Sequence, residues 1–361
     1  MLKKKPMLWL SLLLAFGLVA AACGSDDEDT SSDTTEADGG GSADCPDVEG
    51  DVIVSGSSTV EPISVRVGEL LEECGSGVAA TVDGPGTGDG FQLFCTGETD
   101  ISDASRPIKI DPEESEKCEA NGIEFIELKV GIDGLSVLTN PANELECLSF
   151  ADLYALIGPE SEGFESWSDA QDLATELGSD TTFPDASLDI TAPGEESGTY
   201  DSFTEIVFGD ISEARAEEGF ITEDQIETTR KDYSSQADDN AIISGIEGSD
   251  SSLGWVGFAF AEEAGDGVKE LAVSEEPGGE CIAPTPETIS SNEYPISRDL
   301  FIYVNAAQAE ENPAVAAFVD FYLSDAGIGA VSEVGYVDLA PEDLEATRGV
   351  WEARETGTRE G

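Results

Sequence analysis

Residues 51–77 have the sequence DVIVSGSSTVEPISVRVGELLEECGSG, and this stretch decides the fold class. The β-branched run at 52–54 predicts a short strand, and a polar Gly-Ser turn follows it. Apolar residues then recur at helical spacing from Ile63 onward, and Pro62 suits a first helical turn. Gly75 follows the last of these residues and predicts the end of the helix. The stretch therefore predicts a strand, a polar turn and a helix in that order.

Strand and helix patterns continue to alternate along the chain. β-rich runs occur at 123–128, 135–138, 188–193 and 300–305, and Gly131 and Gly134 separate the first two. Helical patterns cover 145–158, 167–177 and 313–336. Such alternation predicts an α/β architecture with a mostly parallel sheet. In sheets of this kind, ligands bind at the carboxyl ends of strands, where polar turns open helices.

The N-terminal segment 1–22 has the pattern of a lipoprotein export signal. Three lysines at positions 3–5 precede the apolar run MLWLSLLLAFGLVAAA at 7–22, which is short for a membrane span. Ala20-Ala21-Ala22-Cys23 resembles a bacterial lipobox, in which cleavage leaves a lipidated cysteine at the new N-terminus. We therefore expect lipidation at Cys23, with plain secretion and an uncleaved anchor as the alternatives.

Residues 23–49 are expected to form a disordered acidic tether, because their Gly, Ser and acidic residues cannot bury enough apolar surface to fold. The whole chain is also acidic, with 78 Asp and Glu against 16 Lys and Arg. Removal of the segment 1–22 takes away three lysines and no acid, so the formal charge changes from −62 to −65. This charge argues against nucleic acid and anionic lipid headgroups as partners.

The cysteines and the missing histidines limit the chemistry further. Beyond Cys23, six cysteines remain at positions 45, 74, 95, 118, 147 and 281, an even number that suggests three disulfides among 15 connectivities. The chain contains no histidine, which removes the usual general base of hydrolases and the usual zinc ligand. We expect neither a metal site nor a cofactor.

Four polar turns carry donors suited to a small oxyanion. They are Ser57-Ser58-Thr59, Gly86-Thr87-Gly88, Ser105-Arg106 and Ser197-Gly198-Thr199. Each offers backbone N–H groups near a helix start, and hydroxyls or a guanidinium add further donors. Helix capping alone explains any single turn of this composition. Four such turns in one exported α/β chain favour a shared anion site.

Five segments together resemble a known family. Residues 55–63, 86–109, 133–141, 194–205 and 297–305 are similar, in the same order, to the phosphate-binding proteins of high-affinity phosphate ABC transporters. The resemblance runs from about residue 50 to about residue 340. It implies a two-lobed type II periplasmic-binding-protein fold with the ligand cleft between the lobes, crossover strands near 131–136 and 297–303, and no enzyme activity. The first lobe, lobe 1, would comprise positions 50–132 plus 299–345. The second, called lobe 2, would comprise positions 133–298, and positions 346–361 would form a C-terminal tail.

The same resemblance implies the ligand donors. They match Ser58 and Thr59, Thr87, and Ser197, Gly198 and Thr199, and the polar turns add Ser57 and Ser105 as expected phosphate ligands. Known members have an aspartate where this chain has Ser105, and an arginine where it has Pro193. We therefore expect Arg106, beside Ser105, to be the substitute cation. The carboxylate that accepts the ligand proton is expected among Glu196, Glu195, Asp201 and Asp103, in that order.

Disulfides and partners are implied in the same way. The family pairing matches Cys95–Cys118, Cys147–Cys281 would pair within the second lobe, and Cys45–Cys74 remains. The expected protein is a monomer, anchored by lipid to the outer face of the cytoplasmic membrane, at the cell surface or in the periplasm. It would bind inorganic phosphate and deliver it to an ABC permease. The alternatives are another oxyanion such as sulfate, a surface phosphate sensor, or a phosphatase with a Ser or Thr nucleophile.

Overall fold

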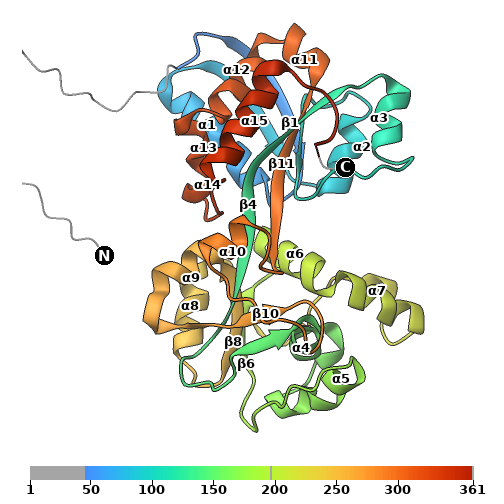
Figure 1. Cartoon of the computed structure of the whole chain (residues 1–361), viewed down its shortest axis with the longest axis vertical. Coiled ribbons are helices and arrows are strands. Elements are labelled where there is room, and N and C mark those ends of the chain that lie inside the picture. The colour runs from blue at the N-terminus through green and yellow to red at the C-terminus, as the bar shows by residue number, and fades with distance from the viewer. Residues whose placement is uncertain (1–44, 196, 360–361) are drawn as a thin grey trace, which may run out of the picture. The chain divides into compact units, whose positions relative to one another are not determined.

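The computed structural model describes residues 45–195 and 197–359, whose helices and strands form two α/β lobes (Figure 1). The predicted export signal, Cys23 and most of the predicted tether lie outside these residues. A nine-stranded sheet runs through both lobes in the order β2-β1-β3-β11-β4-β8-β6-β7, and β9 pairs with β4 beside this path. The prediction of a two-lobed α/β fold is confirmed.

Lobe 1 begins with the predicted strand, turn and helix. Strand β1 (Glu49–Gly56) leads into α1 (Glu61–Cys74), and Gly75 ends this helix with a φ of 90°. β1 pairs in parallel with β2 (Gly77–Asp83) and β3 (Ile101–Ala104), so the turns after β1 and β3 lie at one edge. The other helices of this lobe are α2 (Thr87–Phe94), α3 (Ser115–Asn121), α11 (Ala306–Glu311), α12 (Pro313–Tyr322), α13 (Asp325–Ile328), α14 (Ala330–Glu333) and α15 (Pro341–Ala353).

Lobe 2 is built around β6 (Asp189–Pro193), which pairs in parallel with β7 (Ser234–Gln236) and β8 (Ser252–Gly257). Its short strands are β5 (Cys147–Ser149), β9 (Lys269–Glu270) and β10 (Ala272–Ser274). Its helices are α4 (Phe150–Ile157), α5 (Gln171–Glu176), α6 (Gly198–Phe203), α7 (Gly209–Glu218), α8 (Asp239–Glu247), α9 (Phe258–Ala264) and α10 (Pro286–Ser290). A π-helical turn, Thr204–Phe208, joins α6 to α7.

Two long strands pass between the lobes. They are β4 (Phe125–Thr139) and β11 (Ser297–Asn305), which pair antiparallel with each other, as β11 does with β3 and β4 with β8. The sheet is therefore mixed, with its parallel pairs inside each lobe. Both predicted crossover regions lie within these strands.

The glycines of β4 do not interrupt the strand, although the sequence pattern predicted two separate runs there. A Cβ at Gly131 would lie 2.8 Å from Val331, and one at Gly134 would lie 2.7 Å from Ile289. Both glycines therefore serve close packing of neighbouring side chains against the crossover strand. The sequence pattern could not distinguish a glycine that allows close packing from a glycine that ends a strand.

The C-terminal region differs from the predicted tail at 346–361. Helix α15 continues to Ala353, and Trp351 is buried in the core of lobe 1. The backbone N–H of Gly357 then donates a 2.9 Å hydrogen bond to the carbonyl of Phe125 on β4. The described part of this region thus belongs to lobe 1.

The helical pattern at 313–336 forms three helices instead of one. Ser324 caps α13 by accepting from the N–H of Gly327, and α14 begins after Gly329. Across the described residues, no single helix is long and apolar enough to span a membrane. The segments 313–322 and 325–333 are long and apolar enough only when they are taken together, and a 65° bend separates them. The apolar residues of α12 pack into the core of lobe 1.

The structure contains all three disulfides that the resemblance implied. Cys45–Cys74 and Cys95–Cys118 lie in lobe 1, and Cys147–Cys281 lies in lobe 2. Cys95–Cys118 joins the end of α2 to α3 and so closes the segment between them. That segment includes residues 105–114, which we call the cleft loop.

Candidate functional site

The first-lobe donors follow β1, where the chain turns into α1. The N–H of Ser57 donates to the carbonyl of Asp103 at 2.9 Å, and this bond ties the turn to the end of β3. The Ser57 hydroxyl accepts from the N–H of Thr59 at 3.2 Å and so caps the turn. Ser57 and Thr59 are buried, whereas Ser58 is half-buried. Ser58 thus keeps a hydroxyl at the edge that faces lobe 2.

Thr87 and Ser105 form the second group of donors. Thr87 starts α2, Ser105 follows β3, and both are buried. Their hydroxyl oxygens are 3.1 Å apart, and the N–H of Ser105 donates to the Thr87 hydroxyl at 3.2 Å. These two polar turns follow β2 and β3, which both run parallel to β1, so the turns lie at the same edge of the sheet and meet.

The second-lobe turn lies against the first. Ser197 caps α6 by accepting from the N–H of Thr199 at 3.2 Å. A Cβ at Gly198 would lie 3.1 Å from the carbonyl oxygen of Ser58, so glycine allows the turns of the two lobes to approach closely. Helix α6 is held against β8, because Phe203 stacks on Trp255 with ring centroids 4.2 Å apart.

Hydrogen bonds connect the two lobes at this point. The Ser58 hydroxyl donates to Asp201 Oδ2 at 2.8 Å, and the hydroxyls of Thr59 and Ser202 are 3.1 Å apart. Asp201 and Ser202 both belong to α6. The turn before α1 is therefore joined to α6 through side chains.

Two neighbouring cavities lie at this junction. The smaller, about 110 Å³, is lined by Ser57, Ser58, Thr59, Gly84, Pro85, Gly86, Thr87, Ser105, Asp201 and Glu205. The larger, about 770 Å³, shares Thr87, Ser105 and Glu205 with it. Five of the predicted donor residues thus line the smaller cavity. Ser197, Gly198 and Thr199 line neither, and of these Gly198 lies against the Ser58 turn.

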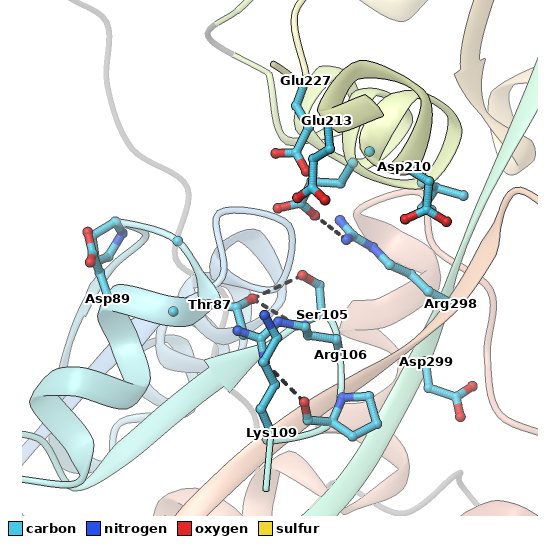
Figure 2. Close-up of a pocket in the computed structure, with 17 residues that line it drawn as sticks. Thr87, Asp89, Ser105, Arg106, Lys109, Asp210, Glu213, Glu227, Arg298 and Asp299 are labelled. Carbon is cyan, nitrogen blue, oxygen red and sulfur yellow. Dashed lines mark hydrogen bonds and ion pairs between the residues drawn. The ribbon is translucent and has the colours of Figure 1, made fainter. Parts of the chain in front are cut away.

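Opposite charges face each other across the larger cavity (Figure 2). Arg106 and Lys109 lie on the lobe 1 side, whereas Asp210, Glu213 and Glu227 lie on the lobe 2 side. Burial raises the pKa of Glu227, as do the neighbouring Glu205 and Glu213, whereas Arg298 and Lys109 lower it. The mouth of the site is therefore more acidic on lobe 2 than on lobe 1.

Arg106, the predicted substitute cation, is already paired. Its guanidinium donates two hydrogen bonds to Glu114, at 2.6 and 2.9 Å, and Glu114 also accepts from the N–H of Lys109. Arg106 lines only the larger cavity. Its charge is largely neutralised within the cleft loop, which makes it a weaker candidate for holding an anion.

Arg298 is the cation that the sequence analysis did not single out. It lies on β11, and its Nη2 donates to Thr59 of lobe 1 at 3.1 Å and to Ser202 of lobe 2 at 2.8 Å. Its Nη1 pairs with Glu205, and its Nε is 3.6 Å from Asp133 Oδ2 on β4. Arg298 and Asp133 are directly opposite in the register of the crossover strands. The segment 297–305 was noted only for its resemblance, although an arginine at a predicted crossover was the available signal.

The four candidate proton acceptors have different positions. Glu196 lies outside the described residues. Glu195 is exposed and pairs with Lys231 at 3.2 Å. Asp103 is fully buried, accepts from the hydroxyl of Ser64 at 2.9 Å, and lines neither cavity. Of the three that the structure describes, Asp201 alone lines the smaller cavity.

The surroundings of Asp201 suit a carboxyl that exchanges a proton. Partial burial raises its pKa, the hydrogen bond from Ser58 lowers it, Glu205 raises it and Arg298 lowers it. Burial is the largest of these effects. Across residues 45–195 and 197–359, no group of three or more His, Cys, Asp or Glu side chains is placed to hold a metal ion.

A family model described as a PBP superfamily domain matches residues 28–326. The chain therefore belongs to the PBP superfamily, whose members are substrate-binding proteins. Protein SphX of Synechocystis sp. is 35% identical over 310 residues, which cover 85% of this chain and 84% of that protein. Phosphate-binding protein PstS of Staphylococcus epidermidis is 32% identical over 338 residues, covering 92% of this chain and 89% of that protein.

A solved structure agrees with these relatives. The crystal structure of a "possible phosphate binding protein" from Planctomyces limnophilus is 34% identical in sequence, with a TM-score of 0.74. The similarity covers 85% of this chain and 99% of the Planctomyces limnophilus chain. The chain is thus similar, over most of its length, to two proteins whose names refer to phosphate binding, PstS and the Planctomyces limnophilus protein.

Proposed function

We propose that the protein binds inorganic phosphate between its lobes and delivers it to an ABC permease. The observation that carries this proposal is the small cavity that Ser58, Thr59, Thr87 and Ser105 line together with Asp201. Hydroxyls and turn N–H groups suit the phosphate oxygens, and the Asp201 carboxylate suits the proton of hydrogen phosphate. The second carboxylate of the cavity, Glu205, is paired with Arg298. The names of the relatives support the same ligand.

In this proposal the two lobes supply different parts of the site. Ser57, Ser58, Thr59, Thr87 and Ser105 come from lobe 1, and Ser197, Gly198 and Thr199 come from lobe 2. Arg298 supplies positive charge from the crossover strand, and Arg106 contributes at the rim. Each charge-assisted hydrogen bond to the anion is worth about 1.5–3 kcal/mol, so a few of them outweigh the long-range repulsion.

Asp201 is the proposed proton acceptor, ahead of Glu195 and Asp103. A fixed carboxylate accepts a hydrogen bond from protonated phosphate, whereas fully ionised sulfate would face it with an unpaired negative charge. Such a buried mismatch can reject a ligand by several powers of ten. Asp201 therefore provides a physical reason to prefer phosphate over sulfate.

The acidic surface acts mainly on association. The screening length is about 8 Å at physiological ionic strength and about 3 Å at 1 M salt, so exposed carboxylates are felt weakly inside the site. They should slow the approach of an anion most at low salt. A negative protein can therefore hold a negative ligand through short contacts.

Export, lipid anchoring at Cys23 and a monomeric state belong to this proposal. The sequence pattern of the segment 1–23 supports export and anchoring, and Cys23 lies outside the described residues. A substrate-binding protein needs no catalytic base, which agrees with the absence of histidine. Release of phosphate from a generic phosphomonoester by the pure protein would instead support a phosphatase.

Isothermal titration of the purified, phosphate-free protein tests the proposal. We expect a one-to-one complex with phosphate and a Kd well below about 10 µM. Binding weaker than that would contradict phosphate as the physiological ligand. A tighter complex with sulfate would instead support a different oxyanion. If deletion of the gene abolishes phosphate signalling but leaves phosphate uptake normal, the result would instead support a role as a phosphate sensor.

A further inference from the structure

The hydroxyl of Tyr303 lies at the centre of a buried hydrogen-bond chain. Tyr303 is on β11 and is fully buried. Its hydroxyl donates to Glu127 Oε2 at 2.7 Å and accepts from the N–H of Ile108 at 2.9 Å. Burial and the neighbouring Glu127 raise the pKa of Tyr303, so this hydroxyl stays protonated and remains a donor. One side chain therefore links a crossover strand to the cleft loop.

The other oxygen of Glu127 holds the C-terminal segment, residues 355–359. Glu127 lies directly opposite Tyr303 in the register of β4 and β11, and it is 2% exposed. Its Oε1 accepts from the N–H of Arg359 at 2.8 Å. Gly357 forms a parallel bridge with Ile126 on the same strand. The C-terminal segment is thus bound along β4 and connects through Glu127 to Tyr303.

The cleft loop at the far end of this chain carries two candidate site residues. Ser105 lines both cavities and Arg106 lines the larger one, and Ile108 lies just beyond them in the loop. Tyr303 also supports the neighbouring helix, because its ring packs edge-on against Phe91 of α2 with centroids 4.9 Å apart. The same helix begins with Thr87, the partner of Ser105. Tyr303 therefore contacts both segments that bring Thr87 and Ser105 together.

We propose that Tyr303 is a positioning residue for the anion site, and that the bound C-terminal segment holds it in place through Glu127. Release of the C-terminal segment would free one oxygen of Glu127, loosen the Tyr303 hydroxyl and let the cleft loop move. Anion affinity then depends on a segment that lines neither cavity. The part of this inference that concerns affinity rests on the proposed phosphate site, whereas the coupling to the cleft loop does not.

Two variants of the full chain test the coupling. Tyr303→Phe keeps the ring and removes the hydroxyl, and a stop codon after residue 354 removes the C-terminal segment. We expect both to speed hydrogen exchange of the Ile108 amide and to weaken phosphate binding by about 2- to 10-fold, the factor expected for one lost hydrogen bond. Hydrogen exchange is measured on residues 105–114, and phosphate binding by calorimetry.

Tyr154→Phe is a matched control. Tyr154 is also buried and its hydroxyl donates to a carboxylate, Glu160 Oε2 at 3.1 Å, but it lies in lobe 2 away from the cleft loop. This control should lower stability to a similar extent and leave both readouts unchanged. Faster exchange at Ile108 with wild-type affinity in Tyr303→Phe would overturn the positioning role. Unchanged exchange after truncation would overturn the role of the C-terminal segment. If the wild type does not bind phosphate, the proposed function fails, and the exchange readout still decides the coupling.

Discussion

Ser58 and Asp201 lie on different lobes, and the Ser58 hydroxyl donates a 2.8 Å hydrogen bond to Asp201 Oδ2. The bond joins the turn before α1 to helix α6 at the wall of the small cavity. It holds the proposed proton acceptor beside the proposed donors. The relative position of donor and acceptor at this junction is the geometric basis of the phosphate proposal.

Ser58→Ala should weaken phosphate binding by at least about 10-fold. The variant loses the hydroxyl whose one hydrogen orients Asp201, and hydrogen bonds to charged groups are worth about 1.5–3 kcal/mol. Calorimetry with phosphate measures the change. Ser187→Ala is the matched control, because Ser187 also donates to an aspartate, Asp189, at 2.9 Å, but at an exposed place in lobe 2. Equal affinities for the two variants would remove Ser58 from the site.

Arg298→Gln should weaken phosphate binding more than Arg106→Gln. Arg106 is paired with Glu114 inside the cleft loop. Arg298 is also paired, with Glu205, but its guanidinium in addition donates to hydroxyls of both lobes. Loss of Arg298 alone would leave Asp133, which is 1% exposed, as an uncompensated buried carboxylate, which typically costs about 3–5 kcal/mol of stability. Adding Asp133→Asn removes that charge and keeps the protein folded for the titration. Arg348→Gln, at an exposed pair with Asp325, serves as the control. A greater loss with Arg106→Gln would reverse the assignment.

Asp103 should make the folded state less stable as the pH rises. Burial raises its pKa from an ordinary 3.8 to about 8; the Ser64 hydroxyl lowers it, and nearby Glu61 and Asp83 raise it. The neutral form is thus favoured in the folded state, so its stability contribution is full below about pH 4 and is lost as the pH rises toward 8. The difference in unfolding free energy between wild type and Asp103→Asn, measured in urea from pH 4 to 9, should therefore shift in favour of the variant. A difference that does not change with pH would contradict this account.

The disulfide Cys147–Cys281 should contribute strongly to the stability of lobe 2. It connects residues 134 positions apart, and loss of such a crosslink costs about 2–5 kcal/mol. The double variant Cys147→Ala/Cys281→Ala should therefore unfold at a lower urea concentration. Unchanged unfolding of this variant would mean that packing alone holds β5 to the segment around Cys281.

Local patterns predicted the elements that position the site. The strand, turn and helix at 49–74 formed as expected, because Pro62, Gly75 and the apolar spacing all indicated the same structure. The two glycines of β4 led to the wrong prediction of two separate strands, because their small size serves packing against Val331 and Ile289. The polar turns were recognisable by composition, and five of the predicted donors line one cavity.

Pairing across the fold could not be predicted from local patterns. Nothing near Arg106 in the sequence indicates that Glu114 folds back to neutralise it. Likewise, Arg298 and Ser202 are 96 positions apart, and only the crossover strands bring them together. The hydrogen bond between Asp201 and Ser58 was hidden for the same reason, because these residues are 143 positions apart.

Competition between phosphate and sulfate in Asp201→Asn tests the central claim most directly. The wild type should bind phosphate far more tightly than sulfate, because Asp201 accepts from the protonated ligand and repels the ionised one. The amide removes that negative charge, so the ratio of the two Kd values should move toward sulfate by at least about 100-fold. A variant that keeps the wild-type preference for phosphate would contradict the assignment of Asp201 as the acceptor.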